Sequence, residues 1–179
     1  MNDETLLWRP RPPSAYVPTG KVLTVPAQTL VRTTAVLRSA RVVESSCLWL
    51  GVLDEHGNGQ VKSLVSPAQV NRPKNYSVLG NAMLAVAALA REHGWTVVAA
   101  IHSHPGVGVE HSTYDDEMTP SRRAVSIVVP RYGHWSGTWP LGFGVHEYFE
   151  KYWHQLSDEH ARLRVALSDA PEGLVFDLR

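Results

Sequence analysis

The sequence lacks several features that would point to a particular environment. Its 179 residues include one cysteine, Cys47, so the chain cannot form an internal disulfide, and we expect a reducing compartment. The 17 lysine and arginine residues balance 17 aspartate and glutamate residues, which leaves no basic field to attract nucleic acid or anionic lipid. No apolar run approaches the roughly 20 residues of a membrane span, and the first residues lack the charged-then-apolar pattern of a signal peptide. We therefore expect a cytoplasmic protein with neither nucleic acid nor a membrane as its partner.

The length suits a single domain preceded by a short arm. The composition is 44 % apolar and 19 % charged, as is typical of an ordinary globular protein. Four of the twelve prolines fall within residues 9–18. Because proline fixes φ and removes a backbone donor, residues 1–20 are expected to form an extended, proline-rich arm outside the core. Residues 21–179 are then the domain.

Hydrophobic periodicity predicts alternating helices and strands. Helices are expected over residues 26–40, from Asn75 or Ser77 to His93, and over 150–166, with residues 71–74 as a loop. Strands are expected over residues 42–53, 61–65, 96–101, 125–129 and 144–149, of which the first two form a hairpin. This alternation predicts an α/β fold with a mixed central β-sheet flanked by helices.

Two histidines follow the most apolar of these strands. His102 and His104 stand two positions apart, and residues at that spacing on a strand point to the same face, so the two imidazoles converge. Ser112 follows after seven intervening residues, and Asp115 comes three residues later. A returning loop of this length can bring Asp115 beside the histidines. Two histidines and a carboxylate leave a tetrahedral zinc ion with one open position for water, as in catalytic sites.

Other interpretations of these residues remain open. The pattern Ser112-x-x-Asp115 also resembles a helix cap, which is compatible with Asp115 facing a metal. Asp116 or Glu117 could replace Asp115 as a ligand, and His111 is either a loop histidine or a fourth ligand.

Three rival hydrolase classes fit less well. The His-Glu-x-x-His string of helical zinc proteases and the Gly-x-Ser-x-Gly nucleophile elbow are both absent. Amidohydrolase barrels carry a similar histidine pair, but that fold needs about 250 residues. Cys47 lies within an apolar strand, which favours buried packing over a role as a nucleophile.

The ordered string resembles the zinc signature of the JAMM (JAB/MPN-plus) metallopeptidases. It reads His102-Ser103-His104-Pro105, then, after the intervening loop, Ser112-Thr113-Tyr114-Asp115. In that family an upstream glutamate opens a strand that ends in glycine. The stretch Glu44-Ser45-Ser46-Cys47-Leu48-Trp49-Leu50-Gly51 is similar to it, with Cys47 where a glycine is usual. The resemblance covers residues 22 to about 150 and implies a single JAMM/MPN-like domain of the prokaryotic stand-alone type.

The resemblance implies a role for each matching residue. His102, His104 and Asp115 correspond to the ligands of Zn²⁺, Glu44 to the general acid/base that takes a proton from water, and Ser112 to the hydroxyl that supports the tetrahedral intermediate. The implied reaction is hydrolysis of a peptide or isopeptide bond at the C-terminus of a ubiquitin-like protein, as a precursor or as a conjugate. The alternatives are a peptidase for a small peptide or a sulfur-carrier adduct, and a non-enzymatic MPN-type interaction scaffold.

Two further features bear on the site. Glu55 is the rival glutamate, but it lies in a turn beyond Gly51 and is a weaker candidate than Glu44.

Eight of the fifteen aromatic residues fall within residues 132–153. Most of these rings are expected to pack in the core, and those on the loop 132–139 could form a partner-binding ridge.

Overall fold

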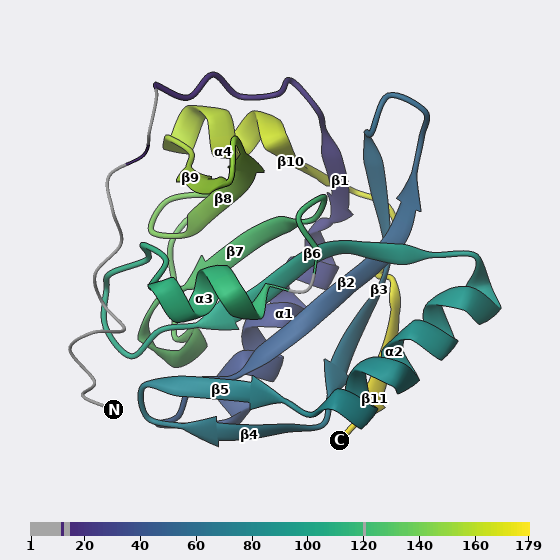
Figure 1. The fold of residues 1–179 in the computed structure, drawn as a ribbon, viewed down its shortest axis with the longest axis vertical. Coiled ribbons are helices and arrows are strands. Elements are labelled where there is room, and N and C mark those ends of the chain that lie inside the picture. Colours follow the sequence, from purple (N-terminus) through teal and green to yellow (C-terminus); the bar gives the residue numbers. More distant parts are fainter. Residues whose placement is uncertain (1–11, 13–14, 120) are drawn as a thin grey trace.

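A mixed sheet of nine strands forms the centre of the molecule (Figure 1). The computed structural model describes residues 12, 15–119 and 121–179. The strands run in the order β10-β1-β3-β2-β6-β7-β8-β9, and β11 also pairs with β3. Their bounds are β1 Leu23–Pro26, β2 Ser46–Leu53, β3 Gly59–Pro67, β6 Thr96–Ser103, β7 Val125–Val129, β8 Gly144–Phe149, β9 Tyr152–Gln155, β10 Val165–Ser168 and β11 Leu174–Leu178. The sequence therefore predicted the α/β class and the mixed sheet correctly.

The remaining elements cover this sheet on both faces (Figure 1). They are the helices α1 Ala27–Ser39, α2 Gly80–His93, α3 Thr113–Met118 and α4 Asp158–Arg164, the short 3-10 helix η2 Arg131–Gly133, and a separate hairpin of β4 Gln69–Arg72 and β5 Asn75–Val78. None of the helices in this described part of the chain is long and apolar enough to cross a membrane.

Strand β2 separates two hydrophobic clusters. Cys47 and Trp49 belong to the larger cluster, which α1 covers, whereas Leu48 and Leu50 belong to the smaller cluster against α2. Successive strand residues point to opposite faces, so a strand that is apolar throughout can fill both clusters. The Trp49 indole N–H also donates to the Thr33 hydroxyl at 2.8 Å, which ties α1 to the sheet.

Several expected elements occur as predicted. The first helix begins directly after Pro26, β2 and β3 form the expected antiparallel hairpin, and β7 and β8 have the expected bounds. Gly94 ends α2 in the left-handed conformation, with φ of 67°, which glycine adopts without a steric cost.

The expected C-terminal helix over residues 150–166 is wrong. Glu150 and Lys151 both have positive φ, 46° and 64°, and they form a two-residue turn that pairs Phe149 with Tyr152. Positive φ at both positions is the signature of the tight turn that matches the twist of a hairpin. Hairpin pairing of β8 with β9 therefore replaces the first part of the helix, and only α4 remains helical.

The region before the site also differs from expectation. Residues 71–74 do not form an isolated loop but include the turn of the β4–β5 hairpin, so α2 begins at Gly80 and not at Asn75 or Ser77. The strand expected from residue 42 begins at Ser46. Arg41 has φ of 65°, so the chain turns after α1 and reaches the sheet later.

The N-terminal arm is described only at residue 12 and from residue 15 onward, and the expectation for its other residues lies outside the described part. Residues 15–20 have no regular structure, but the half-buried Tyr16 packs against the larger hydrophobic cluster. Its ring stacks on His154 at 4.4 Å, and its hydroxyl donates to Glu147. This part of the arm therefore lies against β8 and β9 at the edge of the core.

Candidate metal centre

The end of β6 positions both histidines. His102 is the last but one residue of β6 and lies opposite Ser46 of β2 and Val128 of β7, so it is held from both sides and is only 2 % exposed. His104 follows the strand, and its N–H donates to the carbonyl of Val129 at 2.9 Å. The two Nε2 atoms are 3.1 Å apart, as the alternation of a strand predicts.

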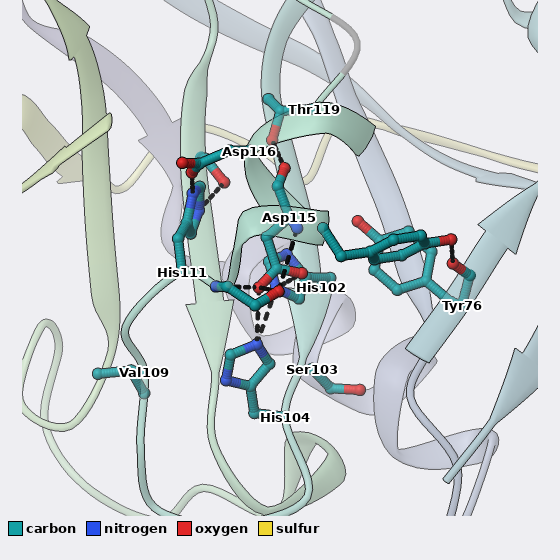
Figure 2. Close-up of polar contacts among 12 residues, drawn as sticks. Tyr76, His102, Ser103, His104, Val109, His111, Asp115, Asp116 and Thr119 are labelled. Carbon is teal, nitrogen blue, oxygen red and sulfur yellow. Dashed lines mark hydrogen bonds and ion pairs between the residues drawn. The ribbon is translucent and has the colours of Figure 1, made fainter. Parts of the chain in front are cut away.

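Helix α3 supplies the third group. Ser112 caps this helix, since the Asp115 N–H donates to its hydroxyl oxygen at 3.2 Å. In return the N–H and the hydroxyl of Ser112 both donate to Oδ2 of Asp115, at 2.7 and 2.8 Å. The Asp115 carboxylate reaches the histidines, with Oδ1 3.2 Å from Nε2 of His102 and Oδ2 3.4 Å from Nε2 of His104 (Figure 2). One capping pair thus starts the helix and also aims the carboxylate.

The donor set fits a tetrahedral metal ion. Ligand atoms bound to zinc at 2.0–2.1 Å lie about 3.3 Å from one another in a tetrahedron, and the three distances here are 3.1, 3.2 and 3.4 Å. The Nδ1–H of His104 donates to the Gly108 carbonyl at 3.1 Å, which leaves the Nε2 lone pair available for a metal. Burial alone would raise the pKa of Asp115, but His102 and His104 hold it well below its usual range. The group His102, His104 and Asp115 could therefore hold a metal ion.

Glu44 lies in the same cleft as this group. The cleft has a volume of about 410 Å³, and its walls include Glu44, His104, Ser112, Tyr114 and Asp115. Glu44 precedes β2 by two residues, its N–H donates to the Arg72 carbonyl at 2.8 Å, and it is 5 % exposed. Burial raises its pKa to about 7, a change that His104 opposes and Asp115 reinforces. A carboxyl group with a pKa near neutrality is suited to exchanging protons at physiological pH.

The rival candidates do not join this cluster. Glu55 sits on the turn between β2 and β3 with 87 % of its side chain exposed, and it lines a different cavity. Cys47 is fully buried in the larger hydrophobic cluster, where burial raises the pKa of its thiol. Glu117 is exposed on α3.

His111 and Asp116 bind each other and are not part of the group. Nδ1 of His111 lies 2.9 Å from Oδ1 of Asp116, and the pair points away from the Asp115 carboxylate (Figure 2). Their positions therefore do not support His111 as a fourth ligand or Asp116 as a substitute ligand.

Sequence reasoning missed Tyr76 at this site. Its ring centroid is 5.4 Å from that of His102, and it is 6 % exposed on β5. Burial raises the pKa of its hydroxyl well above the usual range. The four-residue strand Asn75–Val78 is too short to show a periodicity, so no signal in the sequence separated it from a helix start.

The aromatic stretch 132–153 is divided between core and surface. Trp139, Phe143 and Trp153 are buried, Trp135 packs against the larger cluster, and Phe149 is exposed. The buried rings agree with the expected core packing. A partner-binding ridge on the loop 132–139 stays a prediction.

The fold and the site together define a small mixed α/β protein with a potential two-histidine, one-carboxylate metal centre. Residues 26–139 match the family of prokaryotic homologs of the JAB domain. This match covers more than half of the chain, and the chain belongs to that family, as the histidine–serine–aspartate string suggested.

Solved structures agree with this fold. The chain is similar to the solution structure of protein DSY2949 from Desulfitobacterium hafniense, with a TM-score of 0.65 and 15 % identity, covering 83 % of this chain and 94 % of that chain. It is also similar to the solution structure of a protein from Salinibacter ruber (strain DSM 13855), with a TM-score of 0.55 and 19 % identity, covering 75 % of this chain and 88 % of that chain. At these identities the likeness concerns the fold alone.

Proposed function

We propose that the protein is a zinc-dependent peptidase that hydrolyses peptide or isopeptide bonds at the C-terminus of a ubiquitin-like protein. The observation that carries this proposal is the position of Glu44. A buried carboxyl group with a pKa of about 7 shares one cleft with a convergent group of two imidazoles and a carboxylate. An acid/base beside a metal group with an open position is the combination that amide hydrolysis by water requires.

His102, His104 and Asp115 would hold the metal ion. Two neutral imidazoles and one carboxylate suit zinc and leave room for a fourth, exchangeable ligand. When bound there, zinc would act as a Lewis acid toward both a water molecule and the carbonyl of the scissile bond. Gly106 and Gly108 line this cleft of about 410 Å³ and are both exposed, so a peptide substrate would reach the site from their side.

Glu44 would move the proton. Its carboxylate accepts a proton from the attacking water as the new carbon–oxygen bond forms. It then gives that proton to the leaving nitrogen as the carbon–nitrogen bond breaks. Without a bound metal, burial raises the pKa of Glu44 to about 7. A bound cation would lower this pKa and favour the carboxylate, which is the form that accepts the proton from water.

The Ser112 hydroxyl can donate either to Asp115 or to a bound substrate. In this structure the hydroxyl donates to Oδ2 of Asp115 at 2.8 Å, and it also lines the cleft. Turned toward the cleft, it would donate to the carbonyl oxygen as negative charge develops there. The substrate class rests on the resemblance to JAMM peptidases, since fold and family alone do not specify a substrate.

Replacement of Glu44 by glutamine tests this proposal. The amide is nearly isosteric but accepts no proton, so Glu44→Gln should keep zinc and the fold while turnover falls by about 10²–10⁴. The assay follows cleavage of a ubiquitin-like protein with a C-terminal peptide extension, and of the same protein joined to a lysine side chain, by mass spectrometry.

Glu55→Gln is the matched control, because Glu55 lies outside the cleft, and it should remain fully active. Loss of cleavage in Glu55→Gln with activity kept in Glu44→Gln would contradict the assignment of Glu44. A zinc-loaded wild type that cleaves neither substrate would favour the non-enzymatic scaffold, or a peptidase for a smaller substrate.

A further inference from the structure

Beside the candidate metal centre, a separate chain of hydrogen bonds joins the side chains of Asp116, His111 and Ser126, here called the row. The Nδ1–H of His111 donates to Oδ1 of Asp116 at 2.9 Å, and Nε2 of His111 accepts from the Ser126 hydroxyl at 2.8 Å. Asp116 lies within α3, His111 in the loop before it and Ser126 in strand β7. The row therefore links the element that carries Asp115 to the sheet.

This row has the order of a serine–histidine–aspartate triad, but it cannot act as one. Ser126 has no exposed surface, and His111 is 3 % exposed. No substrate can reach the hydroxyl of Ser126, because all five residues of its strand are buried. A buried row of hydrogen bonds that is satisfied at each step instead fixes the positions of the elements it joins.

The row and the contacts of Asp115 together hold α3 in one orientation about its axis. Successive residues of a helix point about 100° apart, so Asp115 and Asp116 diverge from the same turn. Asp115 reaches His102 and His104, whereas Asp116 reaches His111 (Figure 2). Because the two contacts lie on different sides of one helix, the helix cannot turn about its axis without breaking one of them.

The same histidine also holds the chain just before the cap. His111 precedes Ser112, and its ring stacks on that of His146 at 3.9 Å. The Nε2–H of His146 donates in turn to the Val109 carbonyl at 3.0 Å. Gly144 permits this approach of β8, because a side chain there would place a Cβ atom 2.1 Å from the Val109 oxygen. The loop between His104 and Ser112 is thus tied to β7 and β8 through His111 and His146.

We propose that His111, held by Asp116 and Ser126, is a positioning residue that sets the place of Asp115 and Ser112 in the metal centre. This inference rests on the proposed function only in that the centre binds a metal. Groups that orient metal ligands typically change metal affinity 10–100-fold when they are removed. None of the printed hydrogen bonds of His111 goes to a proposed ligand, although its ring centroid lies 5.9 Å from that of His102. Its effect on Asp115 and Ser112 should therefore pass through the neighbouring residues of the chain.

Zinc affinity of the metal-free protein, measured by competition with a chromophoric chelator, tests the inference. His111→Phe keeps a ring to stack on His146 but removes the hydrogen bonds to Asp116 and Ser126, and Asp116→Ala removes the carboxylate. Both should weaken zinc binding about 10–100-fold. Asp116→Asn retains an oxygen that accepts from His111, so it should restore most of the affinity lost in Asp116→Ala. Glu117→Gln, exposed on the same helix, should bind as the wild type does.

Thermal unfolding of the metal-free variants separates positioning from general stability. If His111→Phe and Asp116→Ala unfold at lower temperature but bind zinc as tightly as the wild type, the row only stabilises the fold and the inference is wrong. If either variant fails to fold, Ser126→Ala removes one anchor with a small change in volume and should still weaken zinc binding. A wild type that binds no zinc contradicts the proposed function, whereas a wild type that binds zinc with unaffected variants contradicts this inference alone.

Discussion

Ser112 and Asp115 bind each other in both directions. The Asp115 N–H donates to the Ser112 hydroxyl oxygen, and the Ser112 N–H and hydroxyl donate to Oδ2 of Asp115. This reciprocal pair is a capping box, in which two orphan donors at a helix start are satisfied at once. Here it also leaves Oδ1 of Asp115 directed at His102, at 3.2 Å. A short helix of six residues therefore holds the Asp115 carboxylate beside the histidines through its own cap.

Ser112→Ala tests whether this hydroxyl only caps α3 and orients Asp115 or also takes part in catalysis. Loss of the cap should lower the free energy of unfolding by about 1 kcal/mol. Zinc affinity should also fall, because Asp115 loses a donor that orients it. At saturating zinc, turnover should still be lower by about 10²-fold if the hydroxyl also stabilises charge on the carbonyl oxygen. Wild-type turnover at saturating zinc would show that Ser112 is a cap and a positioning group only.

Metal content should depend on the three convergent residues. Wild-type protein should hold about one zinc ion per chain, because the donor set forms a single three-residue group. The double variant His102→Ala, His104→Ala should lose it, and Asp115→Asn should bind it more weakly. Elemental analysis after dialysis measures the content, with Glu117→Gln as the control. Full occupancy in the double histidine variant would mean that the metal binds elsewhere.

Glu44 should destabilise the metal-free protein at neutral pH. Its folded-state pKa is about 7 against an ordinary 4.5, so the folded protein holds this proton where the unfolded chain has released it. Glu44 therefore leaves the free energy of unfolding unchanged below pH 4.5. It lowers that free energy progressively as the pH rises from 4.5 to 7, and the loss remains above pH 7. Glu44→Gln does not ionise and should be more stable than the wild type by about 1–3 kcal/mol at pH 8.

Urea unfolding in the presence of a chelator, at pH 4.5 and pH 8, measures this difference. Glu44→Gln and the wild type should nearly coincide at pH 4.5 and separate at pH 8. An equal difference at both pH values would show that packing, and not ionisation, distinguishes the two side chains.

The contact between Glu147 and the N-terminal arm should stabilise the fold less at acidic pH. Burial opposes ionisation of Glu147, but a hydrogen bond from Tyr16 and the charge of Arg164 lower its pKa below the usual value. Thr19 donates to the same carboxylate at 2.9 Å. Stability from this cluster is therefore present above the ordinary pKa of glutamate and is lost as the pH falls through the lower folded-state pKa.

Tyr16→Phe removes one donor from this carboxylate and should lower the free energy of unfolding at pH 7 by about 1–2 kcal/mol. The loss should shrink in acid, once the pH falls below the lowered folded-state pKa of Glu147. Chemical unfolding at pH 7 and in acid measures it. Val17→Ala, on an 80 % exposed neighbour, is the control and should change little at either pH. A loss in Tyr16→Phe that stays constant with pH would exclude Glu147 as the partner that matters.

Local patterns along the chain were enough to predict several short-range features of the protein. The apolar strand before His102, the spacing of His102 and His104, and the capping pattern of Ser112 and Asp115 are all short-range features. Each is set by the alternation of a strand or by the hydrogen bonds of one helical turn, so each follows from the order of neighbouring residues alone. The β2–β3 hairpin and the left-handed Gly94 were predictable for the same reason.

Features that join distant segments of the chain could not be predicted in this way. The pairing of β8 with β9 overrode the helical pattern of residues 150–166, because Glu150 and Lys151 turn the chain back onto a neighbouring strand. Burial of Glu44 beside Asp115, 71 positions later in the sequence, raises a pKa that no local pattern carries. The sequence left Asp116 open as an alternative to Asp115, and only the folded chain shows Asp116 bound to His111 while Asp115 lies beside His102 and His104. Side-chain burial and long-range hydrogen bonds are properties of the folded chain, and they appear only when its segments are packed together.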